Sequence, residues 1–208
     1  MSVHLHIDEL DRIELDDGFE WRPVRRRFDI RAFGVNAYAP GASGRVVEEH
    51  SESELGHQEI YLVLRGRALF TVDGNDHELG QGELVFVRHP LLRRGAVALT
   101  DDTVVLALGG KPGAAHEPSA WEAMFAAVPA AREGRWAEAI RMHEEALAEQ
   151  PGSAPLLYNL ACMESRGGRP LDAILHLQEA VARDPKWAGH AARDPDFDPI
   201  RVEPGFPA

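Results

Sequence analysis

Cysteine is nearly missing from this chain, with Cys162 alone among 208 residues. A single cysteine excludes an internal disulfide and predicts a protein of the reducing cytoplasm. Cations are also scarce: 22 Lys and Arg stand against 34 Asp and Glu, which gives a formal net charge of −12. Nucleic-acid binding and docking on an anionic membrane both need clustered Lys and Arg. We therefore expect neither kind of partner.

Long apolar runs and several catalytic motifs are missing too. No stretch approaches the roughly 20 apolar residues that span a bilayer. The first residues, Met1 to Glu9, carry acids where a signal peptide needs cations and an apolar run. The sequence has no Gly-x-Gly-x-x-Gly or phosphate-loop motif and no Gly-x-Ser-x-Gly nucleophile elbow.

The apolar residues that are present follow two periods. Between Phe28 and Leu108 they form short runs that end at turn-forming residues such as Asp73-Gly74. The runs cover 33–38, 60–64, 68–72, 84–87 and 104–108. Short strands rich in Val, Leu and Phe at this spacing predict an all-β barrel or sandwich.

From Trp121 onward Ala, Leu and Glu dominate, and the pattern becomes helical. We predict an α+β protein of two domains: a β domain over 1–110 and an all-α domain over 119–208. Residues 111–118 contain Pro and Gly and are expected to form the linker.

The helical half repeats itself with a period of 34 residues. The aligned pairs are Gly134-Arg135 with Gly168-Arg169, Ala139-Ile140 with Ala173-Ile174, Glu145-Ala146 with Glu179-Ala180, and Pro151 with Pro185. The glycines are expected at turns between helices, and the prolines after the second helix of each unit. The stretch 119–186 resembles the tetratricopeptide family, as two units over 119–152 and 153–186. The alternative is a generic pair of helical hairpins.

The tetratricopeptide resemblance implies a protein-binding groove lined by the first helix of each unit. In it, Asn159 stands where many relatives bind a peptide backbone. The alternative is that Asn159 is solvated or bonds a neighbouring helix. Two units are few for a continuous core, so we expect a cap from the tail, with a short helix over 188–193. Phe197, Ile200 and Phe206 are expected to pack on the last helices, and His143 and His176 to lie on the surface.

The segment from Gly44 to Gly66 resembles the first cupin motif at its ends. Gly44 is followed by five residues and His50, and Glu59 is followed by six residues and Gly66. In the middle, Glu52 stands where the second histidine belongs, and the spacing to Glu59 is longer than the motif allows. In the second motif the histidine position falls on Arg93. The resemblance covers about 25–110 and implies a jelly-roll barrel.

Candidate metal ligands follow from this motif. Alternate strand residues share a face, so His57, Glu59 and Tyr61 are expected to point into the barrel. His50, His57 and Glu59 would form a three-ligand site for one divalent transition metal, Fe, Mn, Zn or Ni. Glu52 or Glu54 would add an oxygen. The missing fourth ligand argues against metal, and these residues then have ordinary solvated or structural roles.

Arg93 is expected beside Glu59, and three alternatives remain open for it. The guanidinium forms an internal ion pair where a metal would sit, or it anchors the carboxylate of a small organic acid in a ligand site shared with Tyr61. In the third alternative it faces solvent at the barrel mouth.

The outer face of the same strand, Ile60, Leu62 and Leu64, is apolar and needs a cover. We expect the N-terminal segment around Trp21 and Phe28 or a second copy of the chain to provide it, and the cupin resemblance implies a homodimer.

Two functions compete. The first is a non-enzymatic cupin module that binds a small ligand or acts as a scaffold, joined to a tetratricopeptide module that binds a protein. The second is a metal-dependent cupin enzyme, an oxygenase, isomerase or lyase, that acts on a small organic acid. The sequence does not decide whether the chain is an enzyme.

Overall fold

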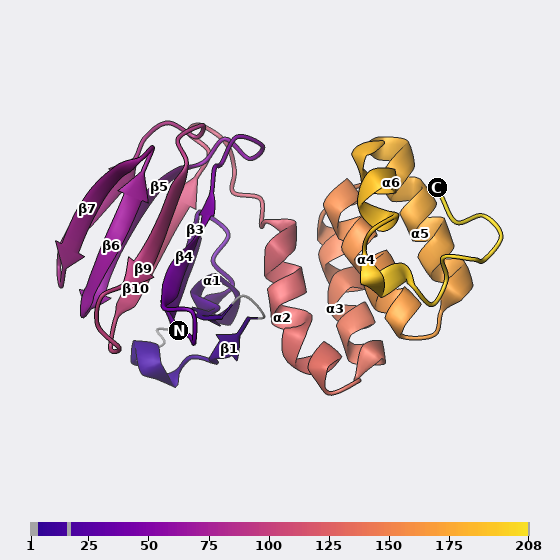
Figure 1. The fold of residues 1–208 in the computed structure, drawn as a ribbon, viewed down its shortest axis with the longest axis horizontal. Coiled ribbons are helices and arrows are strands. Elements are labelled where there is room, and N and C mark those ends of the chain that lie inside the picture. The colour runs from indigo at the N-terminus through magenta and orange to yellow at the C-terminus, as the bar shows by residue number, and fades with distance from the viewer. Residues whose placement is uncertain (1–3, 16–17, 208) are drawn as a thin grey trace. The chain divides into compact units, whose positions relative to one another are not determined.

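The computed structural model of this chain describes residues 4–15 and 18–207. It divides into two compact units, Met1–Pro118 and Ser119–Ala208. Strands occupy the first unit and helices dominate the second (Figure 1), so the predicted order of a β-rich part followed by helices is confirmed. The division falls at the end of the segment predicted as a linker. No helix in the described part of the chain is both long and apolar enough to cross a membrane.

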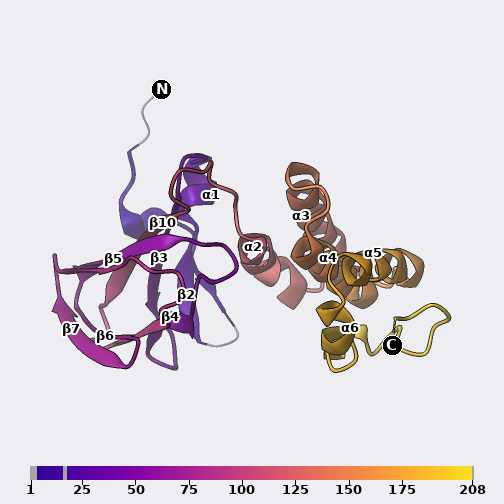
Figure 2. The same ribbon diagram turned by 90° about the horizontal axis from the view of Figure 1, so that it is seen from above.

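The β-rich unit contains two antiparallel sheets, which lie one above the other in Figure 2. The six-stranded sheet has the order β1 (Ile13–Glu14), β2 (Phe19–Arg22), β3 (Gly34–Pro40), β10 (Val104–Gly110), β5 (Gln58–Arg65), β8 (Leu84–Val87). The four-stranded sheet has the order β4 (Arg45–His50), β9 (Arg94–Ala98), β6 (Arg67–Val72), β7 (Asn75–Gly80). This arrangement agrees with a cupin-like β fold. Closure of the sheets into a barrel stays a prediction.

All five apolar runs of the sequence form strands: β3, β5, β6, β8 and β10. The sequence pattern missed β1, β2, β4, β7 and β9. Their composition explains the omission, because β7 is largely polar and β9 begins with an arginine. Such strands have no apolar run that would mark them in the sequence.

The core of this unit lies between the two sheets, where strand alternation brings one face of each strand inward. Tyr61 and Val63 of β5, Phe70 of β6 and Val105 of β10 are at most 1% exposed. The rings of Tyr61 and Phe70 lie 5.4 Å apart between centroids. Each large apolar side chain buried in this way contributes roughly 1.5–3 kcal/mol.

The outer face of the six-stranded sheet is covered at one end. Ile7, in the short 3-10 helix Ile7–Glu9, and Val24, in α1 (Val24–Phe28), join Leu64 and Leu106 in packing against a buried cluster of Ala37, Ala39 and Val104. The N-terminal segment thus provides part of the predicted cover, through these two residues. Phe28 remains 36% exposed.

The helical unit consists of two hairpins, α2 (Ala120–Arg132) with α3 (Trp136–Glu149), and α4 (Ala154–Arg166) with α5 (Pro170–Arg183). The second hairpin begins and ends 34 residues after the first, as Ala120 and Ala154 show. Gly134 and Gly168 lie at the tight turns with φ of 70° and 75°, a conformation that glycine adopts without strain. The repeat in the sequence is thus a repeat of helical hairpins. Its membership of the tetratricopeptide family stays a prediction.

The tail caps the last hairpin, as predicted. It forms α6 (Lys186–Ala191) and a 3-10 turn, Pro195–Phe197. Phe197 is fully buried and Ile200 is 2% exposed, and both belong to the core of α4 and α5. Phe206 packs against the same core.

His143 was predicted to lie on the surface of the helical unit, and the structure shows that it does not. It is fully buried, and its Nδ1 lies 2.8 Å from the carbonyl oxygen of Ala139, one turn earlier in α3. The expectation was wrong because helix packing turns this position inward.

Candidate functional site

Glu59, near the start of β5, is the centre of a buried polar cluster between the two sheets. Its side chain is 15% exposed and points into the core, as predicted. The hydroxyl of Tyr61, two residues along the same strand face, donates to Glu59 Oε2 at 2.6 Å. Because Tyr61 is only 1% exposed, this bond satisfies the one polar atom of a buried ring.

The cation beside Glu59 is Arg94, and the expectation that Arg93 shares the interior with Glu59 is wrong. Arg94 is fully buried, and its Nε and Nη2 lie 2.9 and 2.8 Å from Glu59 Oε2. The side chain of Arg93 is 63% exposed, and its Nε donates to Glu49 at 2.8 Å.

Strand register causes this one-residue difference. In β9, Arg94 and Ala96 are buried and face the core. Val97, on the alternate face, points outward and is 44% exposed. The sequence analysis favoured Arg93 because the histidine position of the second motif falls on it. A slip of one residue reverses every side chain of a strand.

Most donors of Arg94 are used within the protein; Nη2 lies 2.8 Å from Glu59 Oε2 but has no partner with hydrogen-bond geometry among the described residues. Nη1 donates to the carbonyl oxygens of Leu92 at 2.8 Å and Pro90 at 3.4 Å, while Nε bonds Glu59. Glu59 belongs to the six-stranded sheet and Arg94 to the four-stranded sheet. The guanidinium therefore forms an internal ion pair between the sheets, and it is not positioned to anchor the carboxylate of a ligand.

His50, the last residue of β4, lies on the open side of this cluster. Its Cα is paired in register with that of Arg94. Its Nδ1 donates to the carbonyl oxygen of Glu48 at 2.7 Å, so Nε2 points at the carboxylates. Nε2 lies 3.5 Å from both Glu52 Oε1 and Glu59 Oε2. The side chain is 33% exposed, which gives the cluster its contact with solvent.

Glu52 joins the cluster from the loop between β4 and β5. It is 8% exposed, and the backbone N–H of Glu52 donates to Pro90 at 2.8 Å. Its Oε2 lies 3.1 Å from His57 Nδ1, yet no donor in the described residues meets this oxygen with hydrogen-bond geometry. His57 thus contacts Glu52 and is not grouped with Glu59. The predicted trio of His50, His57 and Glu59 therefore does not converge.

The trio that does converge is His50, Glu52 and Glu59, whose ligand atoms lie within 4.8 Å of one another. One imidazole and two carboxylates are donors that divalent transition metals accept. One oxygen of this trio is already engaged, however. Glu59 Oε2 accepts from Tyr61 and Arg94, and the fixed positive charge of Arg94 disfavours a cation at this oxygen.

The charges of the cluster shift the pKa values of its members. Burial raises the pKa of Glu59, but the bonds from His50 and Tyr61 and the charge of Arg94 outweigh it, so the pKa lies below its ordinary value. Burial lowers the pKa of His50, but its interactions with Glu59 and Glu48 outweigh burial and leave the pKa raised. Burial and the neighbouring Glu59 both raise the pKa of Tyr61. Glu59 is therefore a carboxylate and Tyr61 a neutral phenol.

His116 was not anticipated by the sequence analysis. Its ring lies 6.0 Å from that of His57 between centroids, and both of its ring nitrogens are buried without a hydrogen-bond partner in the described residues. Burial lowers its pKa, which favours the neutral imidazole. No sequence signal marks it, because it follows the last strand and belongs to no motif.

A groove of about 620 Å³ lies on the outer face of the four-stranded sheet. Its lining residues are Arg45, Val47, Glu48, Glu49, Leu69, Thr71, Asp73, Gly74, Arg93, Arg94, Gly95, Ala96 and Val97. The residues that alternate with the core, such as Thr71 and Val97, form its floor. Arg93 thus lines a surface groove and not the interior of the fold.

Asn159 lies half-buried on α4, beside the residues that hold the tail. The hydroxyl of Tyr158 donates to Asp194 at 2.7 Å, and that of Ser165 donates to the carbonyl oxygen of Asp196 at 2.6 Å. Arg166 pairs with the carboxylate of Asp196 at 2.9 Å. The tail therefore occupies the side of α4 next to Asn159.

Solved structures of cupin type resemble this chain. KdgF from Halomonas sp. is 19% identical over 52% of this chain and 93% of its own, with a TM-score of 0.40. A cupin-superfamily sugar phosphate isomerase from Silicibacter pomeroyi DSS-3 is 19% identical over 52% and 76%, with a TM-score of 0.39. An RmlC-like cupin from Shewanella frigidimarina NCIMB 400 is 16% identical over 54% and 95%, with a TM-score of 0.40.

No protein-family model and no curated protein matches the sequence. The likeness to cupins therefore concerns about half of the chain.

Proposed function

We propose that the chain is a non-enzymatic module, in which a cupin unit that binds a small ligand or acts as a scaffold is joined to a tetratricopeptide unit that binds a protein. The pairing of Glu59 with Arg94 carries this proposal. By the cupin resemblance, Glu59 is the carboxylate that would bind a metal. In this chain its Oε2 accepts from a buried guanidinium and from Tyr61 instead.

Electrostatics supports the absence of a metal at Glu59. A divalent ion on Glu59 Oε2 would lie close to the guanidinium of Arg94, and at an effective dielectric constant of about 20 the repulsion would be on the order of 5 kcal/mol. The guanidinium itself is held by two backbone carbonyls and is fully buried. Moving it away would leave a buried charge without partners, which costs several kcal/mol more.

We place the small organic acid ligand of this proposal in the groove on the outer face of the four-stranded sheet. The groove holds about 620 Å³, within the range of ~300–1,000 Å³ that small-molecule sites occupy. Arg93 lines it and presents an exposed guanidinium, the group that binds carboxylates in a bidentate manner. Arg94 is not suited to this role, because its side chain is fully buried and forms an ion pair with Glu59.

The protein partner of this proposal binds the helical unit at α4, where Asn159 lies beside the docked tail. An asparagine side chain offers a donor and an acceptor to an extended peptide backbone. The capture of partner proteins by the full chain tests this part. We expect that Asn159→Ala loses proteins that both the wild type and Arg141→Ala retain, because Arg141 is an exposed residue of α3.

A second candidate is the metal-dependent cupin enzyme, and the convergence of His50, Glu52 and Glu59 favours it. The buried oxygen of Glu52 without a hydrogen bond is the strongest sign of a missing positive partner. In this alternative the metal sits toward Glu52 and His50, away from Arg94.

Metal analysis of protein purified without a histidine tag separates the two candidates. The proposal expects less than a tenth of an equivalent of Fe, Mn, Zn or Ni, and a melting temperature that these ions leave unchanged. About one equivalent of metal, lost in both His50→Ala and Glu52→Gln and retained in Glu49→Gln, would overturn it in favour of the enzyme. Glu49 is the matched control because its carboxylate is exposed and bonded to Arg93.

A further inference from the structure

The outer face of the six-stranded sheet carries an apolar patch beyond the end that the N-terminal segment covers. Two rows of paired residues cross three strands, one through Leu108, Ile60 and Phe86, the other through Leu106, Leu62 and Leu84. On β8 the patch is open to solvent, because Leu84 is 56% and Phe86 is 47% exposed. We call Ile60, Leu62, Leu84, Phe86 and Leu108 the β8 patch. Large apolar groups that meet in adjacent rows mark an interaction surface.

The patch ends at an edge of the sheet. β8 is the last strand of the sheet and pairs with β5 alone among the described strands. Edge strands of monomers are normally blocked by a proline, a bulge or an inward-pointing charge. The four residues of β8, Leu84 to Val87, contain none of these. This edge therefore leaves room for another strand to pair with it, although β8 is only four residues long.

The backbone of β8 offers groups to such a strand. The carbonyl oxygen of Glu83 accepts from the N–H of Val63 on β5 at 3.1 Å. Backbone groups in an antiparallel strand alternate between its two neighbours. Those of Val85 therefore also point at β5, and those of Leu84 and Phe86 point outward at the free edge.

We propose that β8 pairs with β8 of a second copy of this chain, antiparallel and with Val85 on the two-fold axis. In this register Leu84 lies opposite the partner subunit's Phe86, and Phe86 opposite the partner subunit's Leu84. The outward N–H and C=O groups of both residues then bond across the axis. Both apolar rows continue without interruption from one subunit into the other, which buries the exposed parts of the β8 patch.

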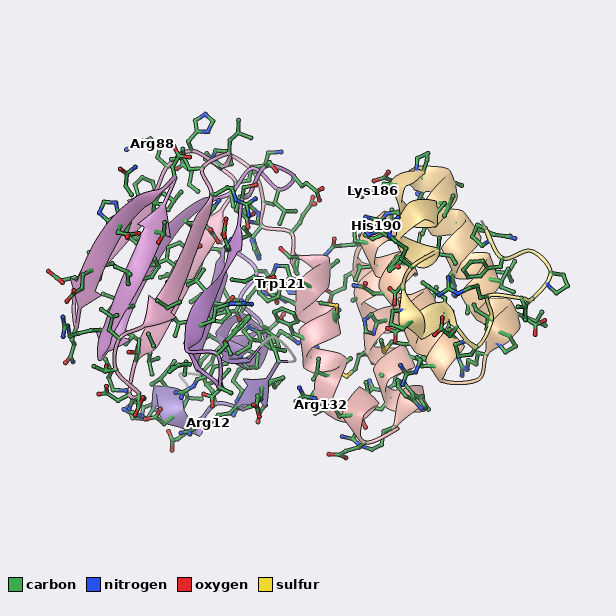
Figure 3. The ribbon with its side chains drawn as sticks, in the orientation of Figure 1. Arg12, Arg88, Trp121, Arg132, Lys186 and His190 are labelled. Carbon is green, nitrogen blue, oxygen red and sulfur yellow. The ribbon has the colours of Figure 1, made fainter. Side chains whose placement is uncertain are left out.

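The charges at the ends of β8 favour a copy of the same strand in this direction. Glu83 precedes the strand and Arg88 follows it, with its guanidinium over the ring of Phe86. Arg88 lies at the rim of the β-rich unit (Figure 3). Antiparallel pairing brings the Glu83 end of one strand to the Arg88 end of the other, whereas parallel pairing would bring like charges together. A two-fold axis also satisfies both edges with one interface.

Sedimentation of the full chain tests the proposal. We expect a dimer of twice 22.9 kDa. Leu84→Lys with Phe86→Lys should raise the dissociation constant by at least about a hundredfold, because two exposed apolar anchors are lost and like charges meet. Val97→Lys is the control, since Val97 is 44% exposed on the outer face of the other sheet and should leave the dimer intact. Far-ultraviolet circular dichroism checks that each variant is folded.

A cysteine scan along β8 tests the register. A residue on the axis lies roughly 4.5 Å from its own copy, Cα to Cα, within reach of a disulfide. Val85→Cys should therefore oxidise to a covalent dimer, while Glu83→Cys, roughly 13 Å from its copy, should not. A monomeric wild type, or a dimer that survives the double lysine variant, would overturn the interface. A covalent dimer from Glu83→Cys and none from Val85→Cys would overturn the register.

Discussion

Arg94 Nε donates to Glu59 Oε2 at 2.9 Å, and this bond joins the four-stranded sheet to the six-stranded sheet. The pair lies between the apolar core and the more open end of the fold at His50. The buried carboxylate stays ionised because its interactions with His50, Tyr61 and Arg94 lower its pKa more than burial raises it. Because Glu59 Oε2 already accepts from Arg94 and Tyr61, this oxygen is not free for a ligand.

Arg94→Ala should destabilise the protein far more than Arg93→Ala. Removing Arg94 leaves Glu59 as a buried charge without its partner, which costs about 3–5 kcal/mol. Arg93 forms an exposed pair with Glu49, and such pairs contribute less than about 1 kcal/mol. Urea titrations of the two variants measure the difference. Equal losses would show that the two arginines have equivalent surroundings.

Gly66→Ala should be more destabilising than Gly44→Ala, although both glycines have a positive φ, of 69° and 72°. A Cβ at position 66 would meet Thr100 Oγ1 at 2.5 Å and Thr103 Cα at 2.7 Å, and one at 44 would meet nothing within 4 Å. Gly44→Ala carries the left-handed strain of about 1–2 kcal/mol alone. Gly66→Ala adds a steric clash of about 1–3 kcal/mol, which thermal unfolding can resolve.

The stability of the helical unit should fall as the pH rises above neutral. The hydrogen bond from His176 to Glu164, at 2.7 Å between α5 and α4, raises the pKa of His176 above its ordinary value of 6.5. A group whose pKa is raised on folding stabilises fully below its unfolded pKa of about 6.5 and loses this contribution as the pH passes its folded pKa. Unfolding of the wild type and of Glu164→Gln across this range measures the effect.

In Glu164→Gln this part of the pH dependence should disappear, because the charged partner is gone. Glu145→Gln, which removes an exposed carboxylate paired with Arg141, should keep it. A wild-type stability that rises between neutral and mildly alkaline pH would contradict the assignment.

Phe197→Ala should destabilise the helical unit by about 3–5 kcal/mol, since the ring is fully buried against the core of α4 and α5. Its centroid lies 5.4 Å from that of Tyr158. Val202→Ala, on the same tail but 91% exposed, should change stability by less than about 0.5 kcal/mol. Comparable effects of the two changes would mean that the tail does not act as a cap.

The sequence predicted the architecture because its signals are local. Five apolar runs gave five strands, and the glycines of the repeat marked the turns at Gly134 and Gly168. Phe197 and Ile200 were predicted to be buried because they are apolar residues in a polar tail, and both are. The spacing of the first motif was also sufficient to predict that Glu59 points into the core.

The partners of Glu59 depend on contacts between distant segments. Whether Arg93 or Arg94 faces inward is set by the pairing of β9 with β4 and β6, and neighbouring arginines carry no periodic signal to distinguish them. The loop after β4 brings Glu52, and not His57, to His50 through a backbone bond to Pro90.

By itself, then, the sequence determined which segments become strands and helices and which residues cap them, since hydrophobic period, glycine and proline act over a few neighbouring positions. Only the tertiary structure decided which charge meets Glu59 and which apolar residues stay uncovered on β8. Those outcomes depend on strand register and sheet order, where a shift of one residue reverses the face that each side chain occupies.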